Sequence, residues 1–327
     1  MLLTVVIDIV KSLILVIFLL TAFAYLTYGE RKVLARFQFR PGPNRVGPFG
    51  LLQPLADGIK MALKEEIIPA EADRYVYLLA PLISLVVALL AFGAIPWGPP
   101  AHLFGRSIPL QIFNPNVGVL YIFAISSLGV YGLVLGGWSS QNKYSLLGGL
   151  RSSAQVISYE LAMGLSVAGV LILAGSASLT HIIRAQDHYW FVFPELIGFL
   201  IYVITAIAET NRAPFDLPEA EQELVAGYHT EYTGMKFAMF AMAEYINMIT
   251  VSGLAATLFL GGWHGPWLPP FLWFLIKVGI FLFIFMWLRA TLPRLRYDRL
   301  MAFGWKVLLP IAVVNTMATA AFVALSR

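Results

Sequence analysis

The sequence predicts an all-α, polytopic membrane helix bundle, and its composition is the first observation behind this. Of the 327 residues, 59% are apolar and only 12% are charged, and the mean hydropathy is +0.78. A soluble globular domain is typically about 45–50% apolar and about 25% charged. The composition therefore excludes a soluble enzyme of this length, a disordered chain and a collagen-like chain.

The second observation is a series of long apolar stretches. A hydrocarbon core of about 30 Å needs about 20 apolar residues per helix, and eight stretches qualify. We expect about eight transmembrane helices in a single integral membrane domain, residues 1–327. The stretches cover residues 3–27, 75–95, 117–138, 154–174, 191–208, 236–261, 269–289 and 305–325. The first is too long for a signal-peptide core and no cleavage-site pattern follows it, so we interpret it as a retained anchor.

The distribution of Lys and Arg predicts the orientation. The odd-numbered loops and their edges carry sixteen basic residues, whereas the even-numbered loops carry only Arg106 and Arg184. Positive charge accumulates in cytoplasmic loops. We therefore expect the odd loops in the cytoplasm and both termini on the opposite side. The net charge of +4 reflects these loops and does not indicate a nucleic acid partner.

The first long loop, about residues 28–74, contains an expected amphipathic helix. Pro41–Asn44 and Gly47–Gly50 predict tight turns. Beyond them, Leu52, Leu55, Ile59 and Ala62 recur at helical spacing, opposite polar residues such as Gln53 and Asp57. We expect a helix over residues 53–64 that lies at the membrane interface. A plain surface linker is the alternative, and no phosphate-binding loop is present because no Gly-Lys-Ser/Thr follows the glycines.

Two carboxylates inside predicted spans are the main functional signal. Glu160 and Glu244 lie roughly 10 Å into their helices at 1.5 Å per residue. An ionised carboxylate at that depth costs several kcal/mol unless it is paired, hydrated or protonated, and such groups usually line polar cavities or proton paths. A structural hydrogen bond between helices is the alternative for each.

Six further carboxylates cluster in the second long loop, about residues 209–235. They are Glu209, Asp216, Glu219, Glu221, Glu223 and Glu231. A helix start capped by Asp216 with a solvated acidic face would explain the run alone. Together with the two intramembrane carboxylates, the run favours a connected, titratable set that relays protons. Lys277, in the seventh span, has two interpretations: snorkelling to the interface, or a buried ion pair.

Electron-carrying groups are not expected in this chain. It has no cysteine, which excludes cysteine-ligated zinc, iron–sulfur clusters and thiolate catalysis here. The five histidines form no pair at helix-facing spacing, so neither a haem nor another metal site is expected. The redox cofactors of any machine that it serves would belong to partner chains.

Seven strings, in order along nearly the whole chain, are typical of one family. They are residues 30–32 (ERK), 40–48 (RPGPNRVGP), 53–60 (QPLADGIK), 158–160 (SYE), 208–221 (AETNRAPFDLPEAE), 243–245 (AEY) and 293–298 (PRLRYD). Together they resemble the H subunits of bacterial NADH-quinone oxidoreductase (respiratory complex I), the counterparts of mitochondrial NADH dehydrogenase subunit 1. The string at 208–221 is very specific.

The resemblance implies an eight-helix subunit of the cell inner membrane that helps to form a quinone cavity and couples quinone reduction to proton translocation. The implied cavity residues are Glu30, Arg31, Arg40, Gln53, Asp57, Lys60, Glu65, Arg212, Phe215, Asp216, Arg289 and Arg294. The implied proton relay comprises Glu160, Glu209, Asp216, Glu219, Glu221, Glu223, Glu231 and Glu244. Quinone would be the substrate, and FMN and iron–sulfur clusters would sit on partner subunits of the complex.

Three other classes stay open at this point. The membrane subunit of an energy-converting hydrogenase would share the bundle, but would match the 208–221 string less closely. A stand-alone secondary transporter would also explain intramembrane charges, although it more often has inverted repeats with broken helices. A structural anchor without chemistry is disfavoured by the buried carboxylates.

Overall fold

The computed structural model, which describes residues 2–103, 106–216 and 226–326, is a bundle of long helices, as predicted. Among these residues, seven helices are long and apolar enough to cross a membrane. They are α1 (Leu2–Phe37), α3 (Arg74–Phe92), α4 (Gly118–Ser139), α5 (Lys143–Ala174), α9 (Gly234–Phe259), α10 (Pro270–Thr291) and a continuous run of α11 (Tyr297–Phe303), a π-helical turn η3 (Gly304–Leu308) and α12 (Leu309–Ser326). The chain is therefore a multi-pass membrane protein.

The expected span at residues 191–208 is shorter than predicted. Its helix, α7 (Leu196–Glu209), has 14 residues and is about 21 Å long at 1.5 Å per residue, less than a hydrocarbon core of about 30 Å. Residues 191–195 form turns, because Pro194 stops a helix from running through them. The apolar segment is nevertheless in the bundle, packed between α5, α9 and α12.

Two other helices extend well beyond their apolar stretches. α1 continues ten residues past the predicted end at 27 and carries Glu30 and Arg31 on a regular helix. α5 begins at Lys143 rather than near residue 154. Asn142 caps this helix start, because its side chain accepts a hydrogen bond from the Tyr144 N–H at 2.9 Å. Neither extension contains a proline that would end it, so hydropathy alone underestimates the helix length.

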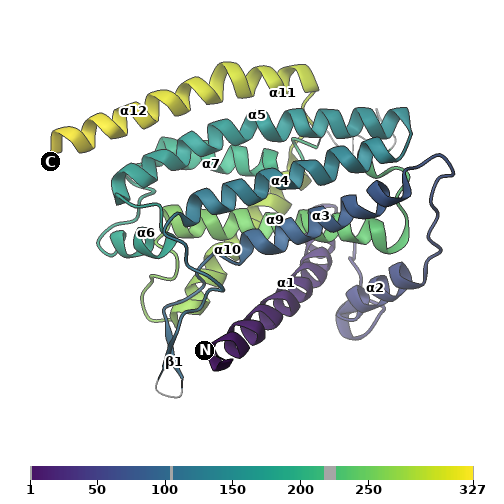
Figure 1. Cartoon of the computed structure of the whole chain (residues 1–327), viewed down its shortest axis with the longest axis horizontal. Coiled ribbons are helices and arrows are strands. Elements are labelled where there is room, and N and C mark those ends of the chain that lie inside the picture. Colours follow the sequence, from purple (N-terminus) through teal and green to yellow (C-terminus); the bar gives the residue numbers. More distant parts are fainter. Residues whose placement is uncertain (1, 104–105, 217–225, 327) are drawn as a thin grey trace.

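The helices pack around α9, which is the most buried of the long helices. α3 and α10 contact α9, α4 lies between α3 and α5, and α12 covers the outer side of α5. Figure 1 shows α11 and α12 along the upper edge of the bundle and α1 on the opposite side, with both chain ends toward the left. The principal core includes Tyr159, Tyr202 and Phe259.

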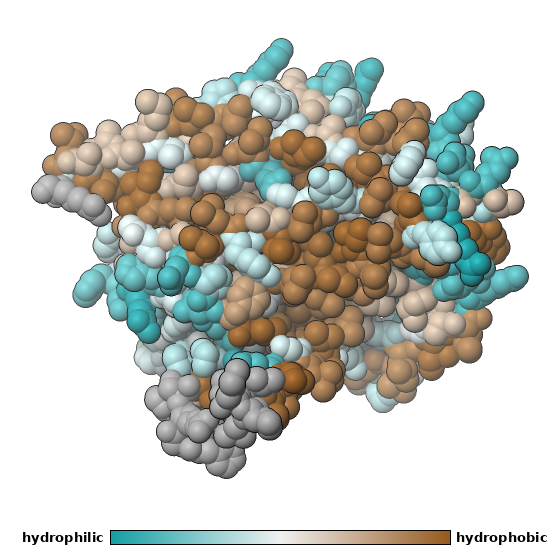
Figure 2. All heavy atoms as spheres, in the orientation of Figure 1, coloured by the Kyte–Doolittle hydropathy of each residue, from teal (hydrophilic) through white to brown (hydrophobic). Residues whose placement is uncertain are grey.

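The outer surface is apolar. Figure 2 shows hydrophobic side chains over most of this face, with hydrophilic ones gathered toward its edges. On α1, Ile9, Leu13 and Ile17 are each more than half exposed. Such a surface is stable only against lipid or an apolar partner.

Short elements connect the long helices. They are η1 (Pro48–Gly50), α2 (Gln53–Leu63), an antiparallel hairpin of β1 (Ala101–Leu103) and β2 (Arg106–Ile108), α6 (Leu179–Ala185) and η2 (Gly227–His229). The turn before α2 requires glycine at position 50. Its φ is +83°, and a Cβ there would lie 2.2 Å from the Pro43 carbonyl oxygen. The helix predicted over residues 53–64 is therefore present as α2, preceded by the expected tight turns.

Candidate functional site

A large cavity of about 570 Å³ lies between α1, α2 and α9 and has two kinds of wall. One part is apolar, with side chains such as Phe23 from α1, Met61 from α2 and Met242 from α9. The other part is charged, and its residues come from all three helices, from α10 and from the loop after α7. These charged residues are Glu30, Arg31, Asp57, Arg212, Glu244 and Arg289.

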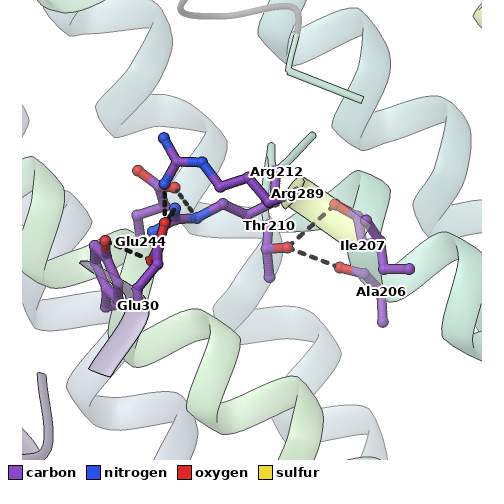
Figure 3. Close-up of polar contacts among 8 residues, drawn as sticks. Glu30, Ala206, Ile207, Thr210, Arg212, Glu244 and Arg289 are labelled. Carbon is purple, nitrogen blue, oxygen red and sulfur yellow. Dashed lines mark hydrogen bonds and ion pairs between the residues drawn. The ribbon is translucent and has the colours of Figure 1, made fainter. Parts of the chain in front are cut away.

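Glu30 is the centre of the charged part. Its side chain is only 4% exposed, and it pairs with Arg212 Nη1 at 3.1 Å and with Arg289. The Tyr245 hydroxyl donates to Glu30 Oε2 at 2.8 Å. Arg212 also pairs through Nε with Glu244 Oε1 at 2.6 Å. Figure 3 shows Glu30, Arg212, Glu244 and Arg289 converging from four separate segments of the chain.

The charges of this cluster balance, because two carboxylates face two guanidinium groups. Desolvation of a lone charge would be very costly, whereas charge-assisted hydrogen bonds offset much of that cost. The Arg212 guanidinium also lies 4.2 Å from the centre of the Tyr245 ring, which stabilises the cation further. The arrangement is a compact polar centre in an apolar bundle.

The position of Arg212 depends on the turn that ends α7. Thr210 donates through Oγ1 to the carbonyls of Ala206 and Ile207, both at 3.1 Å, as Figure 3 also shows. Asn211 adopts a φ of +53°, a left-handed conformation that asparagine tolerates better than most residues. The chain therefore reverses directly after α7 and directs Arg212 toward α1.

α5 holds this turn from the other side. Gln155 Nε2 donates to the carbonyl oxygens of Ala208 and Phe215, each at 2.7 Å. Gln155 is fully buried, so these bonds are protected from water and are correspondingly expensive to break. One side chain thus fixes both ends of the loop that carries Arg212.

α2 is attached to α1 through Asp57. Arg31 Nη1 lies 2.5 Å from Asp57 Oδ2, Lys60 Nζ lies 3.6 Å from Oδ1, and Gln53 Nε2 donates to Oδ1 at 2.8 Å. Partial burial would raise the pKa of Asp57, but the hydrogen bonds from Gln53 and Arg31 outweigh it and hold the pKa below its usual value. Asp57 is therefore ionised at neutral pH and keeps α2 against the mouth of the cavity.

A second, smaller cavity of about 60 Å³ lies deeper in the bundle. Glu244 lines this cavity as well as the large one. Glu209, Ser126 and Asn247 are on its wall, and the same three line a third cavity of about 20 Å³. The carboxylate of Glu244 therefore lies between the charged cavity and a polar interior.

Glu160 continues this series of carboxylates. Its Oε1 accepts a hydrogen bond from the Ser127 hydroxyl, and its charge acts on Glu209, which itself accepts from Ser126. Glu244, Glu209 and Glu160 belong to α9, α7 and α5, respectively. Glu244 and Glu209 thus share the wall of one cavity, and Glu160 lies close enough to Glu209 to act on its charge. Ser126 and Ser127 are hydrogen-bonded to Glu209 and Glu160, respectively.

The comparison with known proteins identifies the family. The model of the NADH dehydrogenase family matches residues 10–320. The chain belongs to this family. Its relatives include the NADH-quinone oxidoreductase H subunit of Protochlamydia amoebophila (strain UWE25), 60% identical over 302 residues that cover 92% of this chain and 93% of the relative. A Geobacter metallireducens relative of the same name, numbered 1, is 55% identical over 313 residues, covering 96% and 95%, respectively. The corresponding protein of Deinococcus deserti is 55% identical over 334 residues, covering 99% and 85%.

Only some of the residues predicted for the quinone cavity are on the described wall of the large cavity. Gln53 is not on the described wall, but it donates to Asp57, which is. Phe215 is buried and packs against Tyr159, with ring centroids 5.7 Å apart. The remaining residues are not part of the described cavity wall: Arg40, Lys60, Glu65, Asp216 and Arg294.

The predicted relay is likewise only partly brought together. Glu231 accepts a hydrogen bond from Asn142 Nδ2 at 2.6 Å, beside the start of α5 rather than on the described walls of the three cavities. Asp216 is the last described residue before residues 217–225. Glu219, Glu221 and Glu223 lie outside the described residues.

The structure shows what the Lys277 side chain contacts. Its side chain is buried, and Nζ donates to the backbone carbonyls of Leu260, Gly262 and His264 at 2.5, 2.9 and 2.7 Å. These carbonyls follow the end of α9 (Gly234–Phe259), where the helix leaves acceptors without internal partners. A lysine in this place satisfies them and interacts favourably with the helix dipole. Among the described residues no carboxylate pairs with Lys277, whereas the snorkelling interpretation stays a prediction.

Sequence reasoning missed several polar residues of the site. Tyr245 follows Glu244 directly and binds Glu30, and Ser126 and Ser127 bind the relay carboxylates. A serine pair inside an apolar span was the available signal. It also missed Glu195, which is fully buried and accepts from Asn315 Nδ2 at 2.6 Å and from Thr319. Glu195 lies at the opposite end of α7 from Glu209 and attaches α12.

Proposed function

We propose that the chain is the quinone-cavity subunit of a proton-translocating NADH-quinone oxidoreductase, and that it couples quinone reduction to proton transfer through Glu244, Glu209 and Glu160. One observation carries the proposal: Glu244 is on the wall of both the large cavity and the deeper polar one. The names of the relatives support the assignment to this complex.

The large cavity fits a quinone in size and chemistry. Ligand pockets commonly measure about 300–1,000 Å³ and combine apolar walls with a few polar groups, and this cavity of about 570 Å³ does so. An isoprenoid tail would lie along Phe23, Met61 and Met242. Arg212 and Arg289 would stabilise negative charge that develops on the quinone oxygens during reduction, because cationic donors are strong partners of an oxyanion.

The coupling step follows from the sharing of Arg212. This guanidinium serves Glu30 and Glu244 at once. An anionic quinone species near Arg212 would compete with Glu244 for it. A carboxylate that loses a cationic partner binds a proton more readily. A proton taken up by Glu244 would then alter the proton affinities of Glu209 and Glu160, since neighbouring titratable groups are coupled.

Other parts of the machine belong to partners in this proposal. Soluble subunits with FMN and iron–sulfur clusters supply the electrons, and neighbouring membrane subunits move further protons. Among the described residues, no group of three or more His, Asp or Glu side chains could hold a metal ion. The subunit would span the cell inner membrane with its odd-numbered loops, including 28–74 and 209–235, in the cytoplasm and both termini outside it.

The test compares Glu244→Gln and Glu160→Gln with Glu71→Gln, an exposed control. Each variant is purified as the intact complex and reconstituted in vesicles. We expect assembled complexes in all three. NADH-driven, inhibitor-sensitive quinone reduction and proton pumping should fall by about a hundredfold or more only in the first two, because one positioned proton-transfer group contributes about 10²–10⁴-fold. Unchanged reduction and pumping in both would overturn the proposal, as would purification of a lone, colourless chain.

A further inference from the structure

A separate cavity of about 250 Å³ lies between α1, α9, α10 and the end of α3. Leu15 and Phe18 of α1, Phe92 of α3, Ile249 of α9 and Phe274 of α10 are among its walls. It shares no described lining residue with the charged cavity, although α1 contributes to both. Among the described residues that line it, none is charged. The cavity is therefore suited to a hydrocarbon rather than to a polar or ionic ligand.

One polar atom in its wall has no partner. The indole Nε1 of Trp97 is buried and makes no hydrogen bond within the described part of the chain. A buried tryptophan N–H usually finds an acceptor, and leaving a donor unpaired is costly. This atom therefore indicates a ligand that brings a single acceptor oxygen together with an apolar chain.

The position of Trp97 fixes where that oxygen would lie. Trp97 comes shortly after the end of α3, and its ring packs on that of Phe271, at the start of α10, with centroids 6.3 Å apart. Both residues thus mark one end of the transmembrane helices, where aromatic side chains face the lipid head-group region. From Phe271 to Leu282, both of which line the cavity, α10 rises about 16 Å into the membrane at 1.5 Å per residue.

The cavity is also accessible from the side. Phe18 and Tyr25, on its α1 wall, are 40% and 48% exposed. On its α10 wall, Gly279 has no atom within 4 Å of the place where a Cβ would be. The surface around it is the apolar outer surface of the bundle, so a chain can enter directly from the bilayer.

We propose that this cavity binds one acyl chain of a membrane phospholipid, and that the ester carbonyl oxygen of that chain accepts a hydrogen bond from Trp97 Nε1. A phospholipid places its ester groups at the interface and its acyl chains in the hydrocarbon core. The cavity matches this arrangement, because its hydrogen-bond donor lies at the interfacial end and its apolar wall extends into the core. Because the charged cavity is not involved, this proposal does not depend on the quinone assignment.

The test uses the intact complex in phospholipid vesicles that contain a phosphatidylethanolamine with a photoreactive diazirine in one acyl chain. Labelled peptides are identified by mass spectrometry. We expect label on residues 15–26 and 271–282. Gly279→Leu, which fills the cavity without a backbone contact, should reduce this labelling to background. The matched control Gly164→Leu, in α5, also has no atom within 4 Å of a new Cβ and should leave labelling unchanged.

A second variant isolates the hydrogen bond. Trp97→Phe keeps an aromatic ring and removes the donor. In competition with unlabelled lipid, the affinity for the labelled lipid should fall by about fivefold, the effect of one neutral hydrogen bond. The lipid proposal is overturned if the peptides carry no label or if Gly279→Leu labels like the wild type. It is also overturned if a long-chain quinone, but not excess phospholipid, displaces the label. Inhibitor-sensitive quinone reduction, measured in the same samples, reports separately on the proposed function.

Discussion

Replacement of Arg212 by glutamine should open the charged cluster locally, and the size of the effect can be worked out from its contacts. Arg212 is 8% exposed in its side chain and pairs with Glu30 at 3.1 Å and with Glu244 at 2.6 Å. In the variant, Glu30 keeps Arg289, whereas Glu244 loses the buried guanidinium with which it pairs. Breaking one buried pair costs about 3–5 kcal/mol. Because the Glu244 side chain is 20% exposed, we expect the lower end, about 3 kcal/mol.

Hydrogen exchange of the intact complex, followed by mass spectrometry, measures this local opening free energy. Exchange in residues 205–216 and 240–250 should accelerate by about two orders of magnitude, the equivalent of about 3 kcal/mol. Arg31→Gln is the matched control, because Arg31 forms an ion pair that is 51% exposed on the arginine side. An exposed pair contributes only about 0.2–1 kcal/mol.

A double variant separates the ion pair from other effects of the substitution. Glu244→Gln removes the carboxylate charge that pairs with Arg212. The combined cost should therefore fall short of the sum of the single costs by about 0.5–3 kcal/mol, the range for residues in direct contact. If the two effects simply add, or if Arg212→Gln behaves like Arg31→Gln, the reasoning about this cluster is wrong.

Two further predictions concern packing and pH. Since the pKa of Asp57 is lowered in the folded protein, its contribution to holding α2 is present above the pKa of the unfolded chain, about 3.9, and is lost as pH falls through the lower folded pKa. Exchange of α2, corrected for the chemical rate, should show this loss in the wild type but not in Asp57→Asn. Gly132→Ala should destabilise the α3–α4 contact by about 1–3 kcal/mol, because the new Cβ would lie 2.0 Å from Ser84 Oγ. Adding Ser84→Ala should recover part of that loss of thermal stability, whereas Gly129→Ala, whose Cβ meets its nearest atom at 3.6 Å, should cost little.

Hydropathy predicted the bundle well because burial in lipid is read directly from composition. It was least accurate where a helix leaves the hydrocarbon layer. α1 runs to Phe37 although its apolar stretch ends near 27, and α7 is shorter than its apolar stretch. Helix ends depend on capping residues and on helix-breaking residues such as Pro194. Hydropathy reports only which part of a helix is apolar, so it does not locate these ends.

The partners of the charged residues could not be predicted from local pattern. Glu30 and Arg212 are 182 positions apart, and Tyr245 reaches Glu30 across 215. The sequence indicated that Glu160 and Glu244 needed explanation, because intramembrane carboxylates are costly. Which cation satisfies each depends on how α1, α9 and α10 pack, and Lys277 illustrates the difficulty, since backbone carbonyls satisfy it instead of a carboxylate.

α2 shows how a correct helix prediction leaves its orientation open. The spacing of Leu55 and Ile59 indicated an amphipathic helix, and such a pattern alone would usually predict that these residues are buried. They are instead 63% and 53% exposed, whereas Asp57 on the other face is held by Arg31. α2 thus presents Pro54, Asp57, Gly58 and Met61 to the cavity, and Leu55 and Ile59 face outward. An outward apolar face would be stable at a membrane interface, so this orientation supports the interfacial position of α2, which stays a prediction.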